Sequence, residues 1–112
     1  MIDSYSFGKI IINGTTYSSD VIIYPEKVDA SWWRKDGHNL CVNDIKDILD
    51  FKPELLIIGQ GNSGLMKVST KIQSTIKNMG LELFVSGTKK AVQKYNEIYK
   101  NKKTVAALHL TC

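Results

Sequence analysis

The chain has 112 residues, of which 43% are hydrophobic and 23% are charged, and its formal net charge is +4. This length and ordinary composition fit one globular domain over residues 1–112 and exclude intrinsic disorder. No apolar run reaches the ~20 residues of a membrane-spanning helix, and the N-terminal residues resemble no signal or transit peptide, so we expect a cytoplasmic protein without a membrane segment.

The first third of the chain predicts β-strands. Residues 6–12 form one predicted strand, and Asn13-Gly14 follows it. Both turn residues accept the positive φ of a type I′ turn, so residues 15–24 are predicted as the returning strand of a hairpin. The apolar end of this strand, residues 21–24, lacks alternation, which indicates burial on both faces. Residues 28–33 form a third predicted strand.

The middle of the chain predicts a short helix and a buried strand. Asn43 has the side chain of an N-cap, and the apolar spacing after it predicts an amphipathic helix that ends near Phe51. Residues 55–58 are wholly apolar, which is typical of a strand in the centre of a sheet.

The last part of the chain alternates helices with strands. A helix capped by Ser69 or Thr70 is predicted to end at Gly80, and a second helix begins at Thr88. Two further strands are predicted, at residues 81–85 and 104–110. From residue 55 on, the order is therefore β-α-β-α-β, for which parallel neighbours are the default. The predicted fold class is α/β with a mixed sheet, because an N-terminal antiparallel hairpin precedes this unit; the direction of the last strand stays open.

Short segments in a fixed order resemble a known family. They are Phe7-Gly8, Asp20-Val21-Ile22-Ile23-Tyr24-Pro25, Trp32-Trp33-Arg34-Lys35, Gly37-His38, Ile58-Gly59-Gln60-Gly61 with Gly64, Tyr95-Asn96 and Ala106-Ala107-Leu108-His109-Leu110-Thr111-Cys112. The chain is similar to the small domain family that includes the mitochondrial respiratory complex I assembly factor 3 and the adipogenesis-associated domain protein. The resemblance implies a single three-layer α/β domain around a mixed central sheet. It implies partner binding or assembly and no particular reaction. Gln60 stands where relatives often carry Ser or Thr.

A glycine-rich loop is the first candidate site. It consists of Gly59, Gln60, Gly61, Asn62, Ser63 and Gly64, and it matches G-x-G-x-x-G between a strand and a helix. A dinucleotide site also needs its third glycine inside the helix and an acidic residue after the next strand, and both are missing. Free amides at this strand end, with Lys67, can form a site for a small anion. The alternative is a tight structural turn.

A second candidate is a surface for a protein partner, formed by Trp32, Trp33, Arg34 and His38. Neighbouring indoles on a strand point to opposite faces, so only one of the two enters the same core. Trp and Arg are favoured at interface hot spots. The alternative is that both indoles pack and the charges are solvated.

Other reactive residues give no catalytic set. His38 and His109 are the only histidines, and no third ligand is spaced for zinc, so we expect no metal and no cofactor. On a strand His109 and Cys112 would face opposite sides, so we expect no Cys-His nucleophile and a buried Cys112. Asp20 has no carboxylate partner that can be placed across a cleft.

Two functions therefore stay open. The first is a non-catalytic binding or assembly module with a protein partner. The second is a small-molecule or anion-binding protein, or a minor enzyme, that uses residues 59–64. Nucleic-acid contact through the basic residues 100–103 is disfavoured, because cations also suit the end of a helix in a solvated loop.

Overall fold

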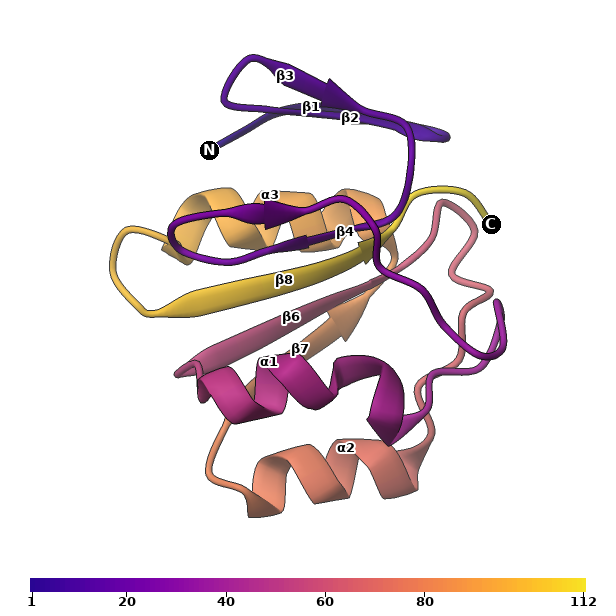
Figure 1. Ribbon diagram of the computed structural model, residues 1–112, viewed down its shortest axis with the longest axis vertical. Helices are drawn as coiled ribbons and strands as arrows, with labels where there is room; N and C mark the ends of the chain where they lie inside the picture. The colour runs from indigo at the N-terminus through magenta and orange to yellow at the C-terminus, as the bar shows by residue number, and fades with distance from the viewer.

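The computed structural model describes residues 1–112, which form two β-sheets and three α-helices (Figure 1). The N-terminal sheet has the strand order β1-β2-β3, and the larger sheet has the order β5-β4-β8-β6-β7. The bounds of the strands are β1 (Ile2–Ser6), β2 (Lys9–Ile12), β3 (Thr15–Tyr17), β4 (Val21–Ile23), β5 (Val28–Asp29), β6 (Leu55–Gln60), β7 (Glu82–Ser86) and β8 (Thr104–His109).

The five-stranded sheet is the middle of three layers. Helices α1 (Lys46–Phe51) and α2 (Thr70–Asn78) cover one face, while α3 (Thr88–Ile98) and the N-terminal sheet cover the other (Figure 1). Alternate residues of β6 enter the two cores: Leu56 and Ile58 pack toward α1 and α2, and Leu55 and Ile57 pack toward α3. Burial on both faces explains the unbroken apolar runs of the central strands. The predicted three-layer α/β fold is confirmed.

The larger sheet is mixed. Strand β6 pairs in parallel with both β7 and β8, as expected for strands joined by helical crossovers, and β4 pairs antiparallel with β8 and β5. The last strand, β8, therefore runs parallel to β6 and antiparallel to β4. This arrangement places the carboxyl ends of β6, β7 and β8 at one edge of the sheet, beside the start of β4.

The predicted turn at Asn13-Gly14, the predicted ends of α2 and the predicted start of α3 are confirmed. Asn13 and Gly14 have φ values of 48° and 82°, which gives the turn between β2 and β3. The Ser69 hydroxyl caps α2 by accepting the Ile72 amide at 3.2 Å, and Gly80 follows that helix with a φ of 85°. Thr88 begins α3, whose buried stripe contains Ala91, Val92 and Tyr95.

Two predicted strands of the first third are wrong in extent. Residues 6–12 contain the end of β1, a turn and β2, because Gly8 adopts a φ of 76° and reverses the chain. Residues 15–24 contain two strands in different sheets. The chain leaves β3 after Tyr17 and crosses to the larger sheet before β4 begins at Val21.

The segment after β5 also differs from prediction. Strand β5 covers Val28–Asp29 only, and residues 30–33 continue as a loop. Asn43 is not an N-cap, since it lies inside a short 3-10 helix, η1 (Val42–Ile45), that precedes α1. Asp44 stabilises its start by accepting the Cys41 amide at 2.8 Å. None of the helices is long and apolar enough to cross a bilayer.

Candidate functional site

The glycine-rich loop follows β6 and packs against the end of the chain. Gly61 is buried and has a φ of 98°. A Cβ atom at this position would lie 2.2 Å from the carbonyl carbon of Cys112 and 2.8 Å from Cδ2 of His109. Glycine is therefore required here for close backbone approach.

The amides of this loop bond to other parts of the chain. The Gly61 amide donates to the Thr88 hydroxyl at 2.9 Å, and the Asn62 amide donates to the Thr111 carbonyl at 2.6 Å. The Gly64 amide bonds to the Gly61 carbonyl, and the Leu65 amide bonds to the Cys112 carbonyl. These four amides are directed at protein acceptors, as in the structural-turn alternative. The amides of Gly61, Asn62 and Gly64 are thus used within the chain, and the anion site at residues 59–64 stays a prediction.

The other two members of the anion hypothesis are Lys67 and Gln60. Lys67 is exposed, and its backbone pairs with the loop that contains His38 and Leu40. The Gln60 side chain folds back and donates to the Met66 carbonyl at 3.0 Å. Lys67 thus connects the glycine-rich loop to the loop of His38 and Leu40, and Gln60 closes the glycine-rich loop through its bond to Met66.

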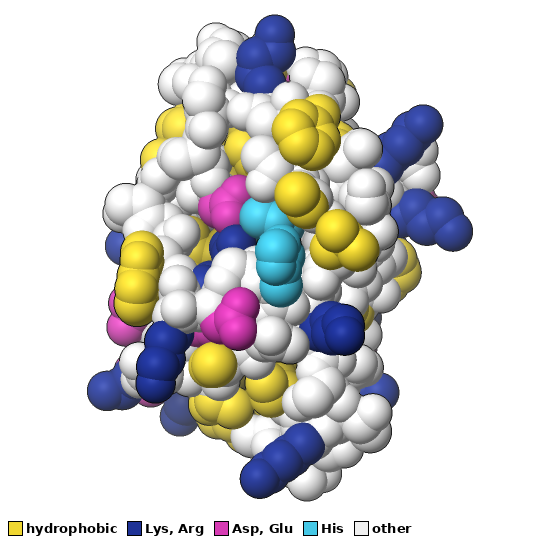
Figure 2. Space-filling model, turned by 90° about the vertical axis from the view of Figure 1, so that its right-hand side faces the viewer, with side chains coloured by type: hydrophobic (Ala, Val, Ile, Leu, Met, Phe, Trp, Pro, Cys, Tyr) yellow, Lys and Arg dark blue, Asp and Glu magenta, His cyan; other side chains and the backbone are white.

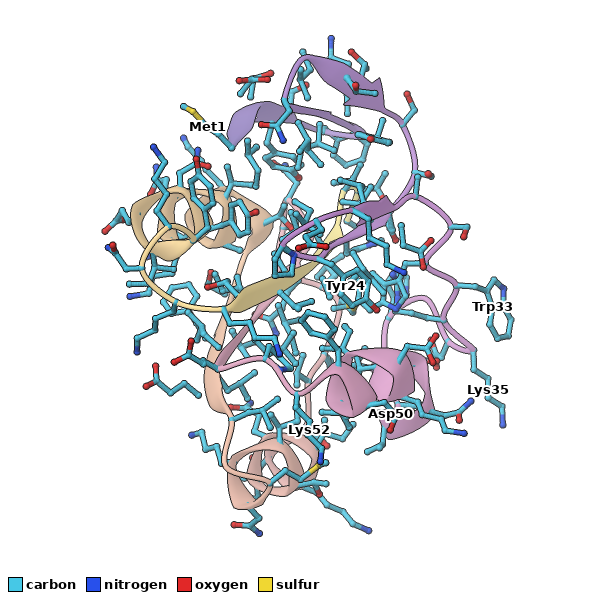
Figure 3. The ribbon with its side chains drawn as sticks, turned by 60° about the vertical axis from the view of Figure 1, so that its left-hand side comes forward. Met1, Tyr24, Trp33, Lys35, Asp50 and Lys52 are labelled. Carbon is cyan, nitrogen blue, oxygen red and sulfur yellow. The ribbon has the colours of Figure 1, made fainter.

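The four residues of the predicted partner surface separate into two pairs. Trp32 is 8% exposed and donates its indole N–H to the Asp44 carbonyl at 3.0 Å. The Arg34 side chain is 6% exposed. Trp33, between them, is 75% exposed, and His38 is also exposed. Figure 3 shows the Trp33 side chain pointing away from the body of the molecule. The two neighbouring indoles do face opposite ways.

A charged cluster holds Arg34 in place, and it was not predicted as a unit. Asp20 Oδ2 accepts from Arg34 Nη1 and from His109 Nδ1, each at 2.8 Å. Asp20 Oδ1 accepts the Leu110 amide at 2.8 Å. The guanidinium also stacks over the Trp32 ring, 4.7 Å from its centroid. One carboxylate thus ties the start of β4, the Trp32–Trp33 loop and the end of β8 together.

The tautomer of His109 follows from its two neighbours. Its Nδ1 atom lies 2.8 Å from Asp20 Oδ2 and 3.0 Å from Arg34 Nη2, and a single nitrogen cannot donate to one and accept from the other at once. A carboxylate demands a donor, so we assign the proton to Nδ1. The His109 Nε2 and Arg34 Nε atoms are buried without a partner. The hydrogen-bonding capacity of the cluster is therefore not fully used within the chain.

The environment of Asp20 favours its charged form. Burial by itself would raise the pKa of this carboxyl group. Hydrogen bonds from His109, from the Leu110 amide and from Arg34 outweigh the burial and lower the pKa of Asp20 below its ordinary value. Asp20 is thus ionised at neutral pH and pairs with the Arg34 cation.

The prediction that His109 and Cys112 face opposite sides of a strand is wrong. Strand β8 ends at His109, so the alternation of a strand does not extend to Cys112. The His109 ring and the Cys112 backbone both approach Gly61. Cys112 is half-buried rather than buried, and no group of three His, Cys, Asp or Glu side chains converges to hold a metal ion.

The exposed face at this end of the molecule combines polar and apolar groups. Figure 2 shows the histidine side chains beside carboxylates, with hydrophobic side chains around them. Phe7, at the β1–β2 turn, and Leu65, after the glycine loop, are 61% and 52% exposed. Both lie next to the C-terminal residues, since the Gly8 amide bonds to the Leu110 carbonyl and the Leu65 amide to the Cys112 carbonyl.

A groove adjoins Trp33. Its volume is about 480 Å³, and its walls come from the Trp32–Trp33 loop, the start of η1 and the first turn of α1. Trp33 and Lys35 stand on one wall, with Lys46 and Asp47 on the other. The groove therefore offers both an apolar side chain and charges of both signs.

Fold and surface together define a small three-layer α/β domain in which a buried ion pair holds a loop with an outward-facing tryptophan. The family described as "Protein of unknown function (DUF498/DUF598)" matches residues 2–110, and the chain belongs to this family. This finding confirms the family resemblance of the sequence.

Solved structures share the fold over nearly the whole chain. A conserved hypothetical protein from Pyrococcus horikoshii is 22% identical, with a TM-score of 0.84, and the match covers 100% of this chain and 99% of that one. The protein MT938 is 23% identical, with a TM-score of 0.79 and coverage of 100% and 98%. A Mth938-like domain from Bordetella pertussis is 20% identical, with a TM-score of 0.70 and coverage of 98% and 85%. At these identities the likeness concerns the fold.

Proposed function

We propose that the chain is a non-catalytic binding or assembly module of the cytoplasm, and that it holds a protein partner through the surface around Trp33. The observation that carries this proposal is the 75% exposure of Trp33, while the side chains of its two neighbours in the chain, Trp32 and Arg34, are buried. Tryptophan is enriched among interface hot spots.

The anchoring of the loop supports the proposal. Trp32 is fixed by its hydrogen bond to the Asp44 carbonyl, and Arg34 is fixed by its ion pair with Asp20. Trp33 thus lies between two residues whose side chains are buried and bonded, which limits the backbone entropy that is lost when a partner binds. The groove beside Trp33 can accept a side chain of the partner.

The free cysteines agree with the proposed location. Cys41 and Cys112 form no disulfide, as is usual for proteins of a reducing compartment. The family resemblance also favours partner binding. The charged cluster has no role in catalysis within this proposal; it positions the Trp33 loop.

The test begins with the immobilised chain, which captures a partner from an extract of the native host. The partner is then purified. Isothermal titration measures its affinity for the wild type, for Trp33→Ala and for Met79→Ala. Met79 is 51% exposed and follows α2, away from the Trp33 surface, so its variant is the matched control. We expect Trp33→Ala to weaken binding by about 30-fold or more, the ~2 kcal/mol of a hot spot, and Met79→Ala to leave it unchanged. Equal affinities of the two variants would refute the proposal.

A further inference from the structure

Strand β7 (Glu82–Ser86) forms an open edge of the larger sheet. It pairs with β6 on one side, and no strand of the chain pairs with its outer side (Figure 1). Helices α2 and α3 pack on its two faces. Its middle residues Leu83, Phe84 and Val85 are nevertheless only half-buried, whereas the β6 residues opposite them are buried. Apolar side chains are therefore partly exposed along this edge.

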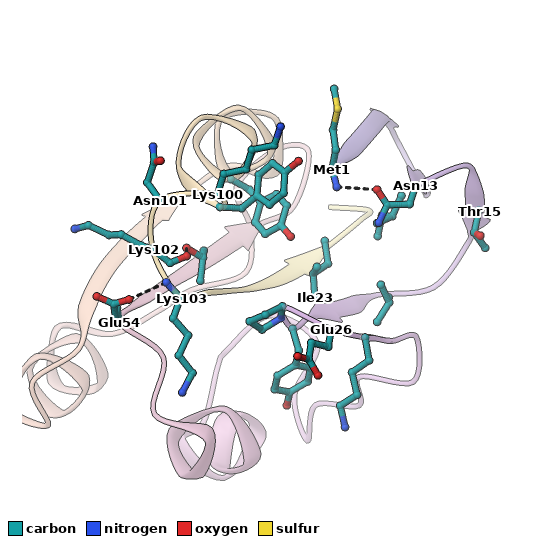
Figure 4. Close-up of a pocket in the computed structure, with 18 of the residues that line it drawn as sticks. Met1, Asn13, Thr15, Ile23, Glu26, Glu54, Lys100, Asn101, Lys102 and Lys103 are labelled. Atoms are coloured by element: carbon teal, nitrogen blue, oxygen red, sulfur yellow. Dashed lines mark hydrogen bonds between the residues drawn. The ribbon is translucent and has the colours of Figure 1, made fainter.

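The start of β7 is fixed, which shows how the strand is turned. The Glu82 amide donates to the Glu54 carbonyl at 3.0 Å, on the β6 side. Glu54 is held in turn by the Lys103 amide, which donates to its carboxylate at 2.9 Å (Figure 4). The Glu82 carboxylate pairs with Lys102 at 2.6 Å. The backbone of Glu82 thus faces β6.

Two residues of β7 direct their backbone polar groups away from β6. These groups alternate between the two sides of a strand, and Glu82 faces β6, so Phe84 and Ser86 face β6 as well. Leu83 and Val85 then face outward. Their amides and carbonyls form none of the hydrogen bonds that the chain makes outside its helices and strands. Two amides and two carbonyls are therefore free at this edge.

The outer strands at the other edges of the two sheets are short or blocked. Strand β5 has two residues and β3 has three. The register of β1 shifts between Ile2 and Ser4, and the Asn96 side chain bonds to the Ile2 amide at 2.9 Å and to the Ile2 carbonyl at 2.8 Å. Irregularities and covering groups of this kind prevent pairing with another chain. Strand β7 has five residues, a regular register and neither Lys nor Pro, so it lacks such protection.

We propose that β7 pairs antiparallel with β7 of a second copy of this chain, about a two-fold axis at Phe84. In this register Leu83 lies opposite Val85 of the second copy, and Val85 lies opposite its Leu83. Opposite residues whose polar groups both point at the pairing strand exchange two hydrogen bonds. Four hydrogen bonds therefore form between the copies, and they use every backbone group that is free at the two edges. The two sheets become one continuous sheet.

The charges of this edge complement themselves in the same register. Phe84 belongs to the core on the α3 side, and Glu82 and Ser86 share its face of the strand. After Ser86 the chain enters α3, whose first turn carries Lys89 and Lys90 and no acidic residue. Antiparallel pairing places Glu82 opposite Ser86 of the second copy, next to this basic helix start, where a carboxylate is favoured. Parallel pairing would place Glu82 beside Glu82, and a two-fold axis in the sheet cannot generate it.

A simpler explanation is that β7 is an edge strand shielded by a lysine of α3. The Lys94 ammonium lies 5.6 Å from the centroid of the Phe84 ring. This contact covers the ring, but Lys94 forms no hydrogen bond with the backbone of β7, so the outward groups of Leu83 and Val85 stay free.

The proposed contact is separate from the surface proposed for the protein partner. Strand β7 is the last strand of the larger sheet, and β5, which leads into the Trp33 loop, is the first. Pairing through β7 therefore leaves the Trp33 surface of each copy accessible, and either proposal can fail without the other.

The first test combines sedimentation velocity with hydrogen exchange followed by NMR. We expect the purified chain to convert reversibly from one copy to two as its concentration rises. The amides of Leu83 and Val85 should exchange rapidly in the dilute sample and become protected in the dimer, whereas the Phe84 amide should be protected in both. A monomer at every concentration, or a dimer in which Leu83 and Val85 exchange as in the monomer, would overturn the proposal.

Two variants of Ser86 separate the proposed register from general charge. Ser86→Lys faces Glu82 of the second copy and should lower the dimer Kd about threefold or more, and Ser86→Glu should raise it by a similar factor, because the pair occurs twice in a two-fold dimer. General repulsion between copies with a net charge of +4 predicts the opposite order. The opposite order, or equal Kd values for the two variants, would overturn the proposal.

A proline variant removes one of the outward amides. Val85→Pro keeps the bonds of β7 to β6, because a proline is tolerated where the N–H faces away from the sheet. We expect this variant to stay monomeric at concentrations at which the wild type is a dimer, with circular dichroism as the check of its fold. A folded Val85→Pro chain with the dimer Kd of the wild type would overturn the proposal, and the Ser86 variants decide the question if this variant does not fold.

Discussion

Arg34 and Asp20 form a buried ion pair, with Arg34 Nη1 2.8 Å from Asp20 Oδ2, and Trp33 stands beside this pair with its indole in solvent. The Asp20 side chain is 18% exposed and also binds His109 and the Leu110 amide. Trp33, the most exposed aromatic residue of the molecule, is thus the chain neighbour of Arg34, whose side chain is held by Asp20. Rigid attachment of this kind prepares a side chain for recognition.

Loss of the Asp20 carboxylate is expected to destabilise the fold. In Asp20→Asn the Arg34 guanidinium stays buried without a counter-charge, which costs about 3 kcal/mol. Urea unfolding followed by circular dichroism measures this loss. The control is Glu82→Gln, which removes the exposed pair with Lys102 and should cost less than about 1 kcal/mol. Similar costs for both variants would contradict the role given to Asp20.

Stability is expected to fall in acid, and Asp20 is expected to contribute to the fall. The pKa of its carboxyl is lower in the folded chain than in the unfolded chain, where it is about 3.9. Its stabilising contribution is therefore complete above this unfolded value and is lost as the pH drops through the folded pKa. The measurement is the free energy of unfolding between pH 7 and pH 2. Asp20→Asn should show a smaller decrease than the wild type; an identical slope would argue against the lowered pKa.

The two tryptophans are expected to differ in their effect on stability. Trp32→Ala leaves a cavity under the loop and should cost about 3–5 kcal/mol. Trp33→Ala removes only exposed surface and should stay within about 0.5 kcal/mol of the wild type. Thermal unfolding of the two variants tests this difference. A large loss of stability in Trp33→Ala would mean that its indole packs on the molecule.

Alanine variants of Gly61 and Gly64 provide a matched test of the close contact between the glycine-rich loop and Cys112. Both have positive φ values, 98° and 70°, so alanine is strained at either position, by about 1 kcal/mol. Only Gly61 also faces the Cys112 carbonyl carbon, while no atom lies within 4 Å of a Cβ at Gly64. Gly61→Ala should therefore cost about 1–3 kcal/mol more than Gly64→Ala in chemical unfolding. Equal costs would show that the glycine loop does not pack on the end of the chain.

Local signals were sufficient for much of the fold. Asn13-Gly14 and Ser69 act within a few residues of themselves, so the sequence predicts the β2–β3 turn and the start of α2. The turn at Gly8 was not predicted, because a single glycine between Phe7 and Lys9 does not reveal that it reverses the chain. The break before Val21 was missed because it depends on which sheet each strand joins, a property of the whole fold.

The charged cluster could not be predicted from local patterns. Asp20 and His109 lie 89 residues apart in the sequence and meet through the pairing of β4 with β8, while Arg34 reaches them from the loop after β5. One signal was available: His109 directly follows four apolar residues, 105–108, of the same strand. A buried polar group of this kind requires a partner, and Asp20 directly precedes another apolar strand. Trp32 and Trp33 do differ in burial, as predicted, but the reason given by the sequence was wrong, because both lie in a loop after β5 and not on a strand.

Site-specific photo-crosslinking in cells of the native host tests the central claim most directly. A photoreactive phenylalanine analogue replaces Trp33 in one variant and Met79 in another, both exposed positions. We expect one adduct of defined mass at position 33 and none at position 79, and less of the adduct when Asp20→Asn releases the loop. No adduct at position 33, or the same adducts at both positions, would contradict the claim that the Trp33 surface holds a protein partner.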